Sequence, residues 1–324
     1  MPPKAIKKKV APKALFKLKR EMGNNFRTNV LLTNRLFDCL IKPILLYGSE
    51  IWGVDEIKNE HDPIELVHAK FCKFILGVGK YAPNIGCRAE LGRYPLSIDA
   101  KLRVLSFHNK RSEAHRNFLS HDAYLDCTPG TYTYNWYVKG KAMVSSVGLG
   151  FLWGNFQVIE KKAQQYLFKQ RLQDIEFQNF EAGIFNDSKK PGQKNKLRTY
   201  CKFKTKYDKE MYLVNVQNIK HREELTRLRI ISCLKLEIEA GRYSRPYRSP
   251  EERLCRQCDL NETDDEWHFL LRCPIYDNLR KEMLDVLEKD KIRFHNKEQL
   301  FHLLLNPPKR YKRLLQSTFF CECV

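Results

Sequence analysis

Hydrophobic residues recur at helical spacing along most of the chain. The first clear case lies between residues 28 and 48, where groups of apolar residues recur about every four positions: Val30, Leu31 and Leu32, then Leu36 and Phe37, then Leu40 and Ile41. This spacing places them on one face of a helix. Pro43 has no amide hydrogen and fits poorly inside a helix, so we expect it to kink or interrupt this one.

A second helix is expected to begin near Asp62. Pro63 would stand at its first position and Glu65 three residues after Asp62, a capping-box pattern, and Gly77 would end it. A third helix is expected from Ser97 to about residue 116.

Further helices follow the same pattern, with one ambiguous stretch. Residues 130–138 are rich in aromatic and β-branched types, which leaves a short strand and an aromatic helix equally open. Two longer amphipathic helices are expected over 156–182 and 218–240. Two short ones are expected over 276–289 and 297–305. The pattern as a whole predicts a mainly α fold.

Charge changes this picture because it is distributed unevenly. The 324 residues carry a formal net charge of +20, which favours a polyanionic partner. Residues 251–324 hold 13 basic and 14 acidic residues, whereas the first 250 hold 45 and 24. We therefore expect any contact with nucleic acid to depend mainly on the residues before 251.

Two stretches concentrate the positive charge. Residues 1–20 hold eight lysines and arginines with no acid, which suits a nuclear-import-like segment or the end of a cut helix. The second stretch, residues 189–209, is named the basic run. Its candidate phosphate-binding residues are Lys189, Lys190, Lys194, Lys196, Arg198, Lys202, Lys204 and Lys206. Aromatic residues at 200, 203 and 207 lie between them and can stack on unpaired bases, or they can anchor the run to a core.

Four residues near the C-terminus have the types and spacing of a zinc site. They are Cys255, Cys258, His268 and Cys273, in the pattern C-x2-C-x9-H-x4-C. Three thiolates and one imidazole satisfy the tetrahedral preference of Zn²⁺. The alternative is that they are ordinary reduced cysteines, because the chain has 11 cysteines. Both half-motifs in this order favour zinc.

Arginines near the zinc motif are a second set of candidate nucleic-acid contacts: Arg253, Arg256 and Arg272. The loop between the two half-motifs is acidic, which disfavours phosphate binding by the loop itself. The zinc can therefore have a purely structural role or take part in RNA binding.

Several kinds of function find no support in the sequence. The chain shows no signal peptide, and no apolar run approaches the roughly 20 residues that a membrane span needs. We therefore expect an intracellular protein of the nucleus or cytoplasm, with reduced cysteines. The sequence contains neither a nucleophile elbow nor a glycine-rich phosphate loop, so it gives no indication of a small-molecule substrate.

An ordered series of segments resembles one family, although only the zinc motif is specific by itself. The likeness is to the region that follows the polymerase core in the reverse transcriptases of non-LTR retrotransposons, the long interspersed elements. It is carried by Phe37–Asp38, Pro43–Gly53, Ile64–Gly79, Glu90–Leu96, Lys196–Tyr200, Leu225–Arg229, Ile238–Tyr243, Arg253–Cys258 and Glu266–Pro274.

The resemblance implies four segments. They are a basic N-terminal segment (1–27), a thumb-like helical domain (28–120), a basic and mainly helical connecting domain (121–250), and a CCHC zinc knuckle followed by helices (251–324). In that family a thumb holds the template–primer duplex, and the knuckle region is linked to binding of the element's RNA. The resemblance therefore implies RNA or DNA as partner, together with the remainder of a reverse transcriptase.

The chain departs from the family where the chemistry should be. A reverse transcriptase holds two divalent metal ions on palm carboxylates, typically in a hairpin with an Asp-Asp pair. The one Asp-Asp pair here is Asp264–Asp265, which lies in the zinc loop without apolar strands around it. We expect a chain that is not an enzyme by itself. Three hypotheses remain: a nucleic-acid-binding retroelement fragment, a zinc-stabilised protein adaptor derived from one, or part of an RNA-directed DNA polymerase whose other domains lie outside this chain.

Overall fold

The computed structural model describes residues 3–23, 25–55, 62–112, 122–124, 135–154, 159–189, 196–230 and 235–307. Over these residues the fold is mainly α, as predicted. Their single β pairing is an antiparallel bridge between Leu254 and Thr263. None of the helices in the described ranges combines the length and the apolar character needed to cross a membrane.

The chain forms two compact units that are discontinuous in sequence. The first unit comprises Met1–Leu18, Leu36–His68 and Tyr94–Asn179, and the second comprises Lys19–Arg35, Ala69–Arg93 and Phe180–Val324. Each unit therefore draws residues from several of the four segments expected from the sequence. Helices α1 (Pro3–Met22), α6 (Pro63–Leu76) and α11 (Lys161–Lys189) contribute residues to both units.

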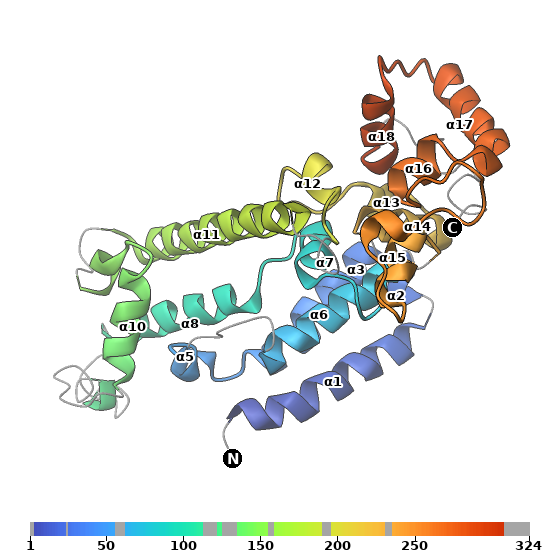
Figure 1. Ribbon diagram of the computed structural model, residues 1–324. Coiled ribbons are helices and arrows are strands. Elements are labelled where there is room, and N and C mark those ends of the chain that lie inside the picture. The colour runs from blue at the N-terminus through green and yellow to red at the C-terminus, as the bar shows by residue number, and fades with distance from the viewer. Residues whose placement is uncertain are drawn as a thin grey trace. The chain divides into compact units, whose positions relative to one another are not determined.

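The first unit contains short elements as well as long helices (Figure 1). Its remaining elements are a π-helix (Phe37–Ile41), α4 (Lys42–Leu45), α5 (Ser49–Trp52), α8 (Leu96–Arg111), α10 (Trp136–Ser145) and a 3₁₀ turn (Gly150–Trp153). Helix α5 packs on α8, and α10 packs on the 3₁₀ turn. The core of the unit consists of Ile98, Val104, Leu105, Val144, Val147, Leu152, Trp153, Phe168 and Leu172.

A buried histidine belongs to this core. The His108 ring stacks on Trp153 with 3.8 Å between ring centroids, and its Nε2 lies 3.1 Å from the Trp153 carbonyl oxygen. The Tyr124 hydroxyl lies 3.1 Å from its Nδ1. Burial lowers the pKa of His108 to about 4. His108 is therefore a neutral core residue at physiological pH.

The second unit is an assembly of shorter helices. They are α2 (Asn25–Thr28), α3 (Val30–Leu36), α7 (Asn84–Leu91), α12 (Tyr200–Phe203), α13 (Tyr212–Asn215), α14 (Ile219–Arg229), α15 (Glu237–Ala240), α16 (Glu266–Leu271), α17 (Asp277–Lys289) and α18 (Lys297–Leu305). Three 3₁₀ turns connect them, over Gly241–Tyr243, Pro250–Glu252 and Pro274–Tyr276. Helix α16 contacts α18. Figure 1 shows α17 near these two helices.

Two helix predictions are confirmed closely. Helix α6 begins at Pro63, and the Asp62 carboxylate accepts a hydrogen bond from the amide of Ile64 at 2.9 Å. The residue after its end, Gly77, has φ of +66°, the left-handed conformation that ends many helices. The predicted helix over 297–305 has the bounds of α18.

Other boundaries differ from the prediction. The helix expected over 28–48 forms as α3, the π-helix and α4, which follow one another without a gap, and Pro43 lies in α4 just after the wider π turn. The helix expected over 218–240 ends at Arg229, and Glu237 starts a separate helix. Ile230 already departs from helical backbone angles, and residues 231–234 lie outside the described residues.

Helix α11 begins five residues later and ends seven residues later than predicted, and α8 ends at Arg111 rather than near residue 116. Of the ambiguous stretch over 130–138, residues 130–134 lie outside the described residues. A helix begins at Trp136, and the Asn135 side chain caps it by accepting from the amide of Tyr137 at 2.8 Å.

A buried ionic network holds the second unit together, and the sequence pattern gave no sign of its pairing. Glu90 on α7 and Arg229 on α14 are fully buried, and each nitrogen–oxygen contact between them is 3.0–3.1 Å. Glu210 Oε2 lies 3.0 Å from the Arg229 guanidinium. The Tyr212 hydroxyl donates to Glu90 at 2.5 Å, and Arg229 also donates to the Leu305 carbonyl at the end of α18.

Candidate metal centre and basic run

A short hairpin places the first two cysteines. The Cys255 amide donates to the Glu262 carbonyl at 2.9 Å, and the Asp264 amide donates to the Arg253 carbonyl at 2.9 Å. These two hydrogen bonds flank the bridge between Leu254 and Thr263. The chain therefore reverses between them, and this turn carries Cys255 and Cys258.

Helix α16 places the other two candidate ligands. Asp265 caps its N-terminus, where the carboxylate accepts from the His268 amide at 2.8 Å. His268 lies in the first turn. Cys273 follows the last turn, where its amide donates to the His268 carbonyl at 2.8 Å. Arg280 on α17 donates to the carbonyls of Leu270 and Cys273 at 3.0 and 2.9 Å, which fixes this end of the helix.

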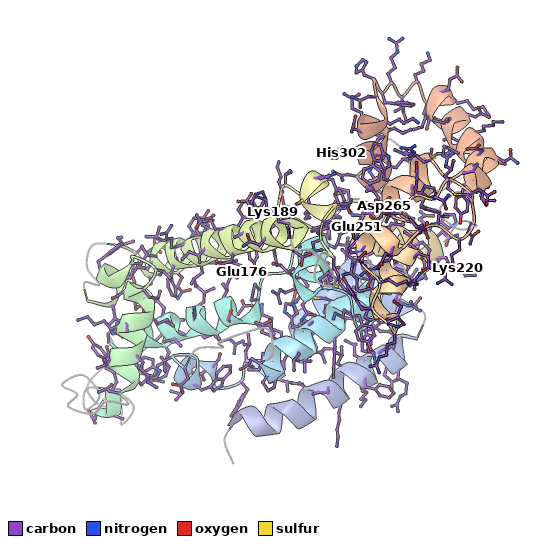
Figure 2. The ribbon with its side chains drawn as sticks, viewed as in Figure 1. Glu176, Lys189, Lys220, Glu251, Asp265 and His302 are labelled. Carbon is purple, nitrogen blue, oxygen red and sulfur yellow. The ribbon has the colours of Figure 1, made fainter. Side chains whose placement is uncertain are left out.

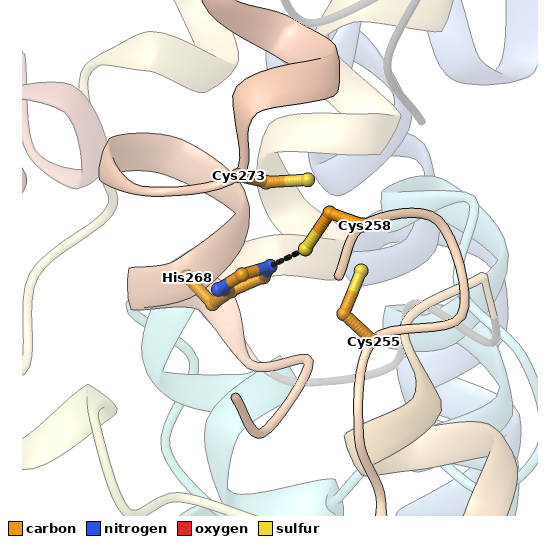
Figure 3. A group of neighbouring side chains, drawn as sticks. All are labelled: Cys255, Cys258, His268 and Cys273. Carbon is orange, nitrogen blue, oxygen red and sulfur yellow. Dashed lines mark hydrogen bonds between the residues drawn. The ribbon is translucent and has the colours of Figure 1, made fainter. Parts of the chain in front are cut away.

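The four side chains converge on one point (Figure 3). Their ligand atoms all lie within 4.8 Å of one another, and Cys258 Sγ is 3.4 Å from His268 Nε2. Ligand atoms around a tetrahedral zinc ion are roughly 3.5–3.8 Å apart, given zinc–ligand bonds of about 2.0–2.3 Å. The cluster is therefore of the right size and chemistry for one metal ion.

A carboxylate outside the cluster fixes the histidine in the form that a metal needs. Glu262 Oε2 lies 3.0 Å from His268 Nδ1, and the other oxygen, Oε1, lies 2.6 Å from the Arg272 guanidinium. A proton on Nδ1 can be donated to this carboxylate, which leaves the lone pair of Nε2 facing the sulfurs. The pairing of a carboxylate with a ligand histidine is typical of metal centres.

Burial of the sulfurs governs their protonation. Burial raises the pKa of Cys255, and burial together with the neighbouring thiols raises that of Cys273 to about 12. Without a metal these thiols stay protonated at neutral pH. The Gln257 amide points at Cys255 Sγ from 3.5 Å and can stabilise a thiolate. Metal binding here would release protons, as at other thiolate sites.

Three acids of the zinc loop have partners within the second unit. Asp264 accepts from the Glu237 amide at 2.8 Å and so caps α15. Asp265 caps α16. Both oxygens of buried Glu266 accept from Arg198 at 2.7 and 2.8 Å. The loop acids therefore tie the metal element to the rest of the second unit.

Part of the basic run points into the protein. Lys196 forms an ion pair with Glu239 at 2.9 Å, and Arg198 pairs with Glu266. Lys204 is only 3% exposed, forms an ion pair with Glu210 and donates to the Asp208 carbonyl at 2.6 Å. Carboxylates of the second unit therefore already neutralise the charges of these three side chains.

The remaining described phosphate-binding candidates of the run face solvent. Lys202 and Lys206 are exposed, and so is Lys189 at the C-terminal end of α11, labelled in Figure 2. The Lys189 ammonium lies 3.9 Å from the centroid of the Phe185 ring. Lys190 and Lys194 lie outside the described residues.

Of the two roles left open for the aromatic residues of the run, the structure favours the second, an anchor to the core. Tyr200, Phe203 and Tyr207 are buried. Phe180 packs edge-on against Tyr200 and Tyr207, at centroid distances of 6.5 and 5.0 Å. Their rings anchor the run to the core because burial of a large apolar surface outweighs exposure of an isolated ring.

The three arginines near the zinc motif differ in position. Arg253 is fully buried, with guanidinium hydrogen bonds to the carbonyls of Arg248 and Ile238 at 2.9–3.1 Å. Arg256 is 67% exposed and lies 3.1 Å from Glu237. Arg272 is half exposed and holds Glu262. Of the three, Arg256 is the most accessible to a phosphate.

Comparison of the chain with the known protein families, with curated proteins and with solved structures gives no match to any of them.

Proposed function

We propose that this chain binds nucleic acid, preferentially RNA, through exposed lysines of the basic run, and that a zinc ion in the Cys₃His cluster stabilises the element that follows. The observation that carries the proposal is the division of the basic run into two sets. Lys196, Arg198 and Lys204 are paired inside the second unit, whereas Lys189, Lys202 and Lys206 point to solvent. The internal ion pairs hold the backbone of the run in place. Its exposed lysines can therefore bind phosphates with little further loss of conformational entropy.

The metal element itself supports a structural role for the zinc. The ligands Cys255, His268 and Cys273 are buried, and the loop acids cap helices or pair with arginine. A buried metal with occupied neighbours has no open coordination position for a substrate. The RNA contacts are therefore assigned to the basic run, and the zinc is assigned to folding.

Salt-dependent RNA binding tests the proposal. The variant in which Lys189, Lys202 and Lys206 are all replaced by Gln should bind a structured RNA several-fold more weakly. Loss of about three phosphate contacts should also lower the slope of log affinity against log salt by about two to three units. Fluorescence anisotropy at several salt concentrations measures both quantities.

The matched control removes the same charge from the C-terminal helices. Lys281, Lys289 and Lys297 are exposed, and their replacement by Gln should leave the salt slope nearly unchanged. If the control variant loses RNA binding while the first variant keeps it, the C-terminal element is the binding site and the proposal is wrong.

We also propose that the chain does not itself join nucleotides. Its Asp-Asp pair is engaged: Asp264 caps α15 and Asp265 caps α16, so neither carboxylate is free to hold a catalytic metal ion. Primer extension on an RNA template, with magnesium and nucleotides supplied, should stay at background. A clear extension product would overturn this assignment.

The resemblance to the thumb and knuckle region of non-LTR reverse transcriptases is consistent with this role. Two of the segments that carry the resemblance supply the partners of the buried pair, Glu90 from 90–96 and Arg229 from 225–229. Two others are linked by the ion pair between Lys196 and Glu239. Ion pairs between these segments give a structural reason for them to occur in the same protein. We propose that the chain derives from such a protein.

A second candidate function is a protein-interaction adaptor. It is favoured by apolar side chains around the metal element that face solvent: Leu254, Leu260 and Ile275 are 37%, 48% and 57% exposed. Exposed apolar groups favour protein contacts where they form a contiguous patch. The salt experiment separates the two functions, because an adaptor without RNA affinity would show no binding for the wild-type chain.

A further inference from the structure

A cavity of about 380 Å³ lies beside the end of the basic run in the second unit. Its lining includes Phe203, Lys206, Lys209, Met211, Tyr212 and Pro307. We propose that this cavity takes one unpaired nucleotide of a single-stranded nucleic acid. The inference rests on the proposed nucleic-acid function and adds to it a site for an individual base and its phosphate.

The walls of the cavity are fixed before any ligand arrives. The Arg229 guanidinium packs on the rings of Phe203 and Tyr212, at 4.6 and 5.0 Å from their centroids. Arg229 is in turn held by the buried carboxylate of Glu90. Neither ring can turn away without breaking this packing. A preformed wall reduces the ordering cost of binding.

The loop that forms the rim is also fastened at several points. Lys204 donates to the Asp208 carbonyl, and the Glu210 amide donates to the Glu90 carbonyl at 2.9 Å. The Tyr207 hydroxyl donates to the Arg93 carbonyl at 3.1 Å. The cavity is therefore built by the fold rather than by the chance position of a mobile loop.

The charges around the cavity favour an anion. Lys206 is exposed and Lys209 is half-buried, and both line the opening. Of the two acids in the lining, Glu210 is already neutralised by Lys204 and Arg229. Asp208 is the remaining acid, so the rim keeps a net positive charge that can attract a phosphate.

The apolar part of the lining suits the flat face of a base. Met211 is 36% exposed, and its flexible thioether can adjust to an aromatic ring. Phe203, Tyr212 and Pro307 also line the cavity, and they present only ring edges to it, because Phe203 is 6% and Tyr212 is 2% exposed. A volume of this size matches a small-molecule site, and a paired base held within a duplex cannot enter it. The combination of two ammonium groups with an apolar wall therefore favours an unpaired nucleotide.

Filling the cavity without changing its charge tests the inference. The Met211→Trp variant should bind a 12-nucleotide single-stranded RNA about tenfold more weakly, because one base loses its contact with the wall. Its affinity for a blunt 12-base-pair RNA duplex and its salt slope should be unchanged, because no phosphate contact is removed. Met211→Leu, which conserves the volume, should behave like the wild-type chain.

A pair of matched charge variants provides the second measurement. Lys206→Gln with Lys209→Gln should weaken single-strand binding more than Lys189→Gln with Lys202→Gln, which removes the same charge outside the cavity. Equal single-strand affinity for Met211→Trp and wild type, in protein with an unchanged unfolding temperature, would overturn the inference. It would also be overturned if the two charge pairs had equal effects. If the wild-type chain binds neither RNA, the proposed function itself has failed, which is a different result.

Discussion

A basic residue in this sequence contributes to an external electrostatic surface only if the fold leaves it unpaired. Lys204 and Arg253 lie in the regions with candidate phosphate contacts, yet both are buried and bound to carbonyls or carboxylates of the second unit. Desolvation of an ammonium or guanidinium is costly, so such groups stay inside only with hydrogen-bonded partners. Lys202 and Lys206 have the same chemistry but remain exposed.

Individual residues should also determine the zinc affinity of the cluster. His268→Ala removes a ligand and should lower zinc content well below one ion per molecule. Glu262→Gln keeps all four ligands but weakens the hydrogen bond that orients His268, so we expect zinc affinity to fall about 10- to 100-fold. Competition with a chromophoric chelator measures both effects.

The control for this experiment is Cys39→Ala, which removes an exposed cysteine of the first unit. It should keep the zinc content of the wild-type chain. Full zinc content in the His268→Ala variant would refute the ligand assignment.

At the scale of secondary-structure elements, helix ends are determined by close contacts as much as by local sequence. Helix α7 ends at Leu91, and the next residue, Gly92, has φ of +60°. A Cβ at Gly92 would lie 2.5 Å from the Lys209 amide nitrogen and 3.0 Å from the Asp208 carbonyl carbon. The end of α7 and the rim of the cavity are therefore packed backbone to backbone.

Two glycines with similar backbone angles separate the cost of conformation from the cost of contact. Gly92→Ala and Gly23→Ala both place alanine in the left-handed region, which costs roughly 1 kcal/mol. Gly23 has no atom within 4 Å of an added Cβ, whereas Gly92 meets backbone. We expect Gly92→Ala to lower the free energy of unfolding by about 1–3 kcal/mol more than Gly23→Ala. Urea unfolding monitored by circular dichroism measures the difference, and equal losses would contradict the packing argument.

At the scale of the whole molecule, the chain is organised by contacts between segments that are distant in sequence. Within the second unit, Arg229 joins α7 through Glu90 and the end of α18 through Leu305. Burial by itself would raise the pKa of Glu90, but the charges of Arg229 and Lys204 and the hydrogen bonds from Arg229 and Tyr212 outweigh it and lower that pKa. The ion pair between Glu90 and Arg229 thus links α7, α14 and the end of α18.

Removal of one partner of this ion pair should destabilise the second unit strongly. Arg229→Met leaves Glu90 buried without its counter-charge, and we expect the free energy of unfolding at pH 7 to fall by about 3–5 kcal/mol. The exposed Arg256, in the control variant Arg256→Met, should cost less than about 1 kcal/mol.

The stability difference between wild type and Arg229→Met should also depend on pH. The folded pKa of Glu90 lies below its unfolded value, so its stabilising contribution is complete above about pH 4.3 and is lost as the pH falls through the lower folded pKa. The difference in unfolding free energy between wild type and Arg229→Met should therefore shrink on acidification from pH 7 towards pH 3. A difference that stays constant over this range would show that Glu90 does not titrate as the ion pair requires.

The sequence by itself determined the features that depend on local spacing. The apolar period predicted a mainly α fold, and the positions of Pro63, Gly77 and the residues of α18 predicted helix bounds that the structure confirms. The spacing of the two half-motifs also predicted the cluster of Cys255, Cys258, His268 and Cys273, because its ligand types sit on one hairpin and one short helix. Such features need only interactions between residues close in sequence.

Only the tertiary structure decided which charges are internal. Glu90 and Arg229 are 139 positions apart, and no local pattern relates them. The same holds for Arg198 with Glu266, and for the burial of Tyr200 within the basic run. The physical reason is that desolvation and pairing depend on what packs against a side chain, and in this fold the packing partner comes from a distant segment.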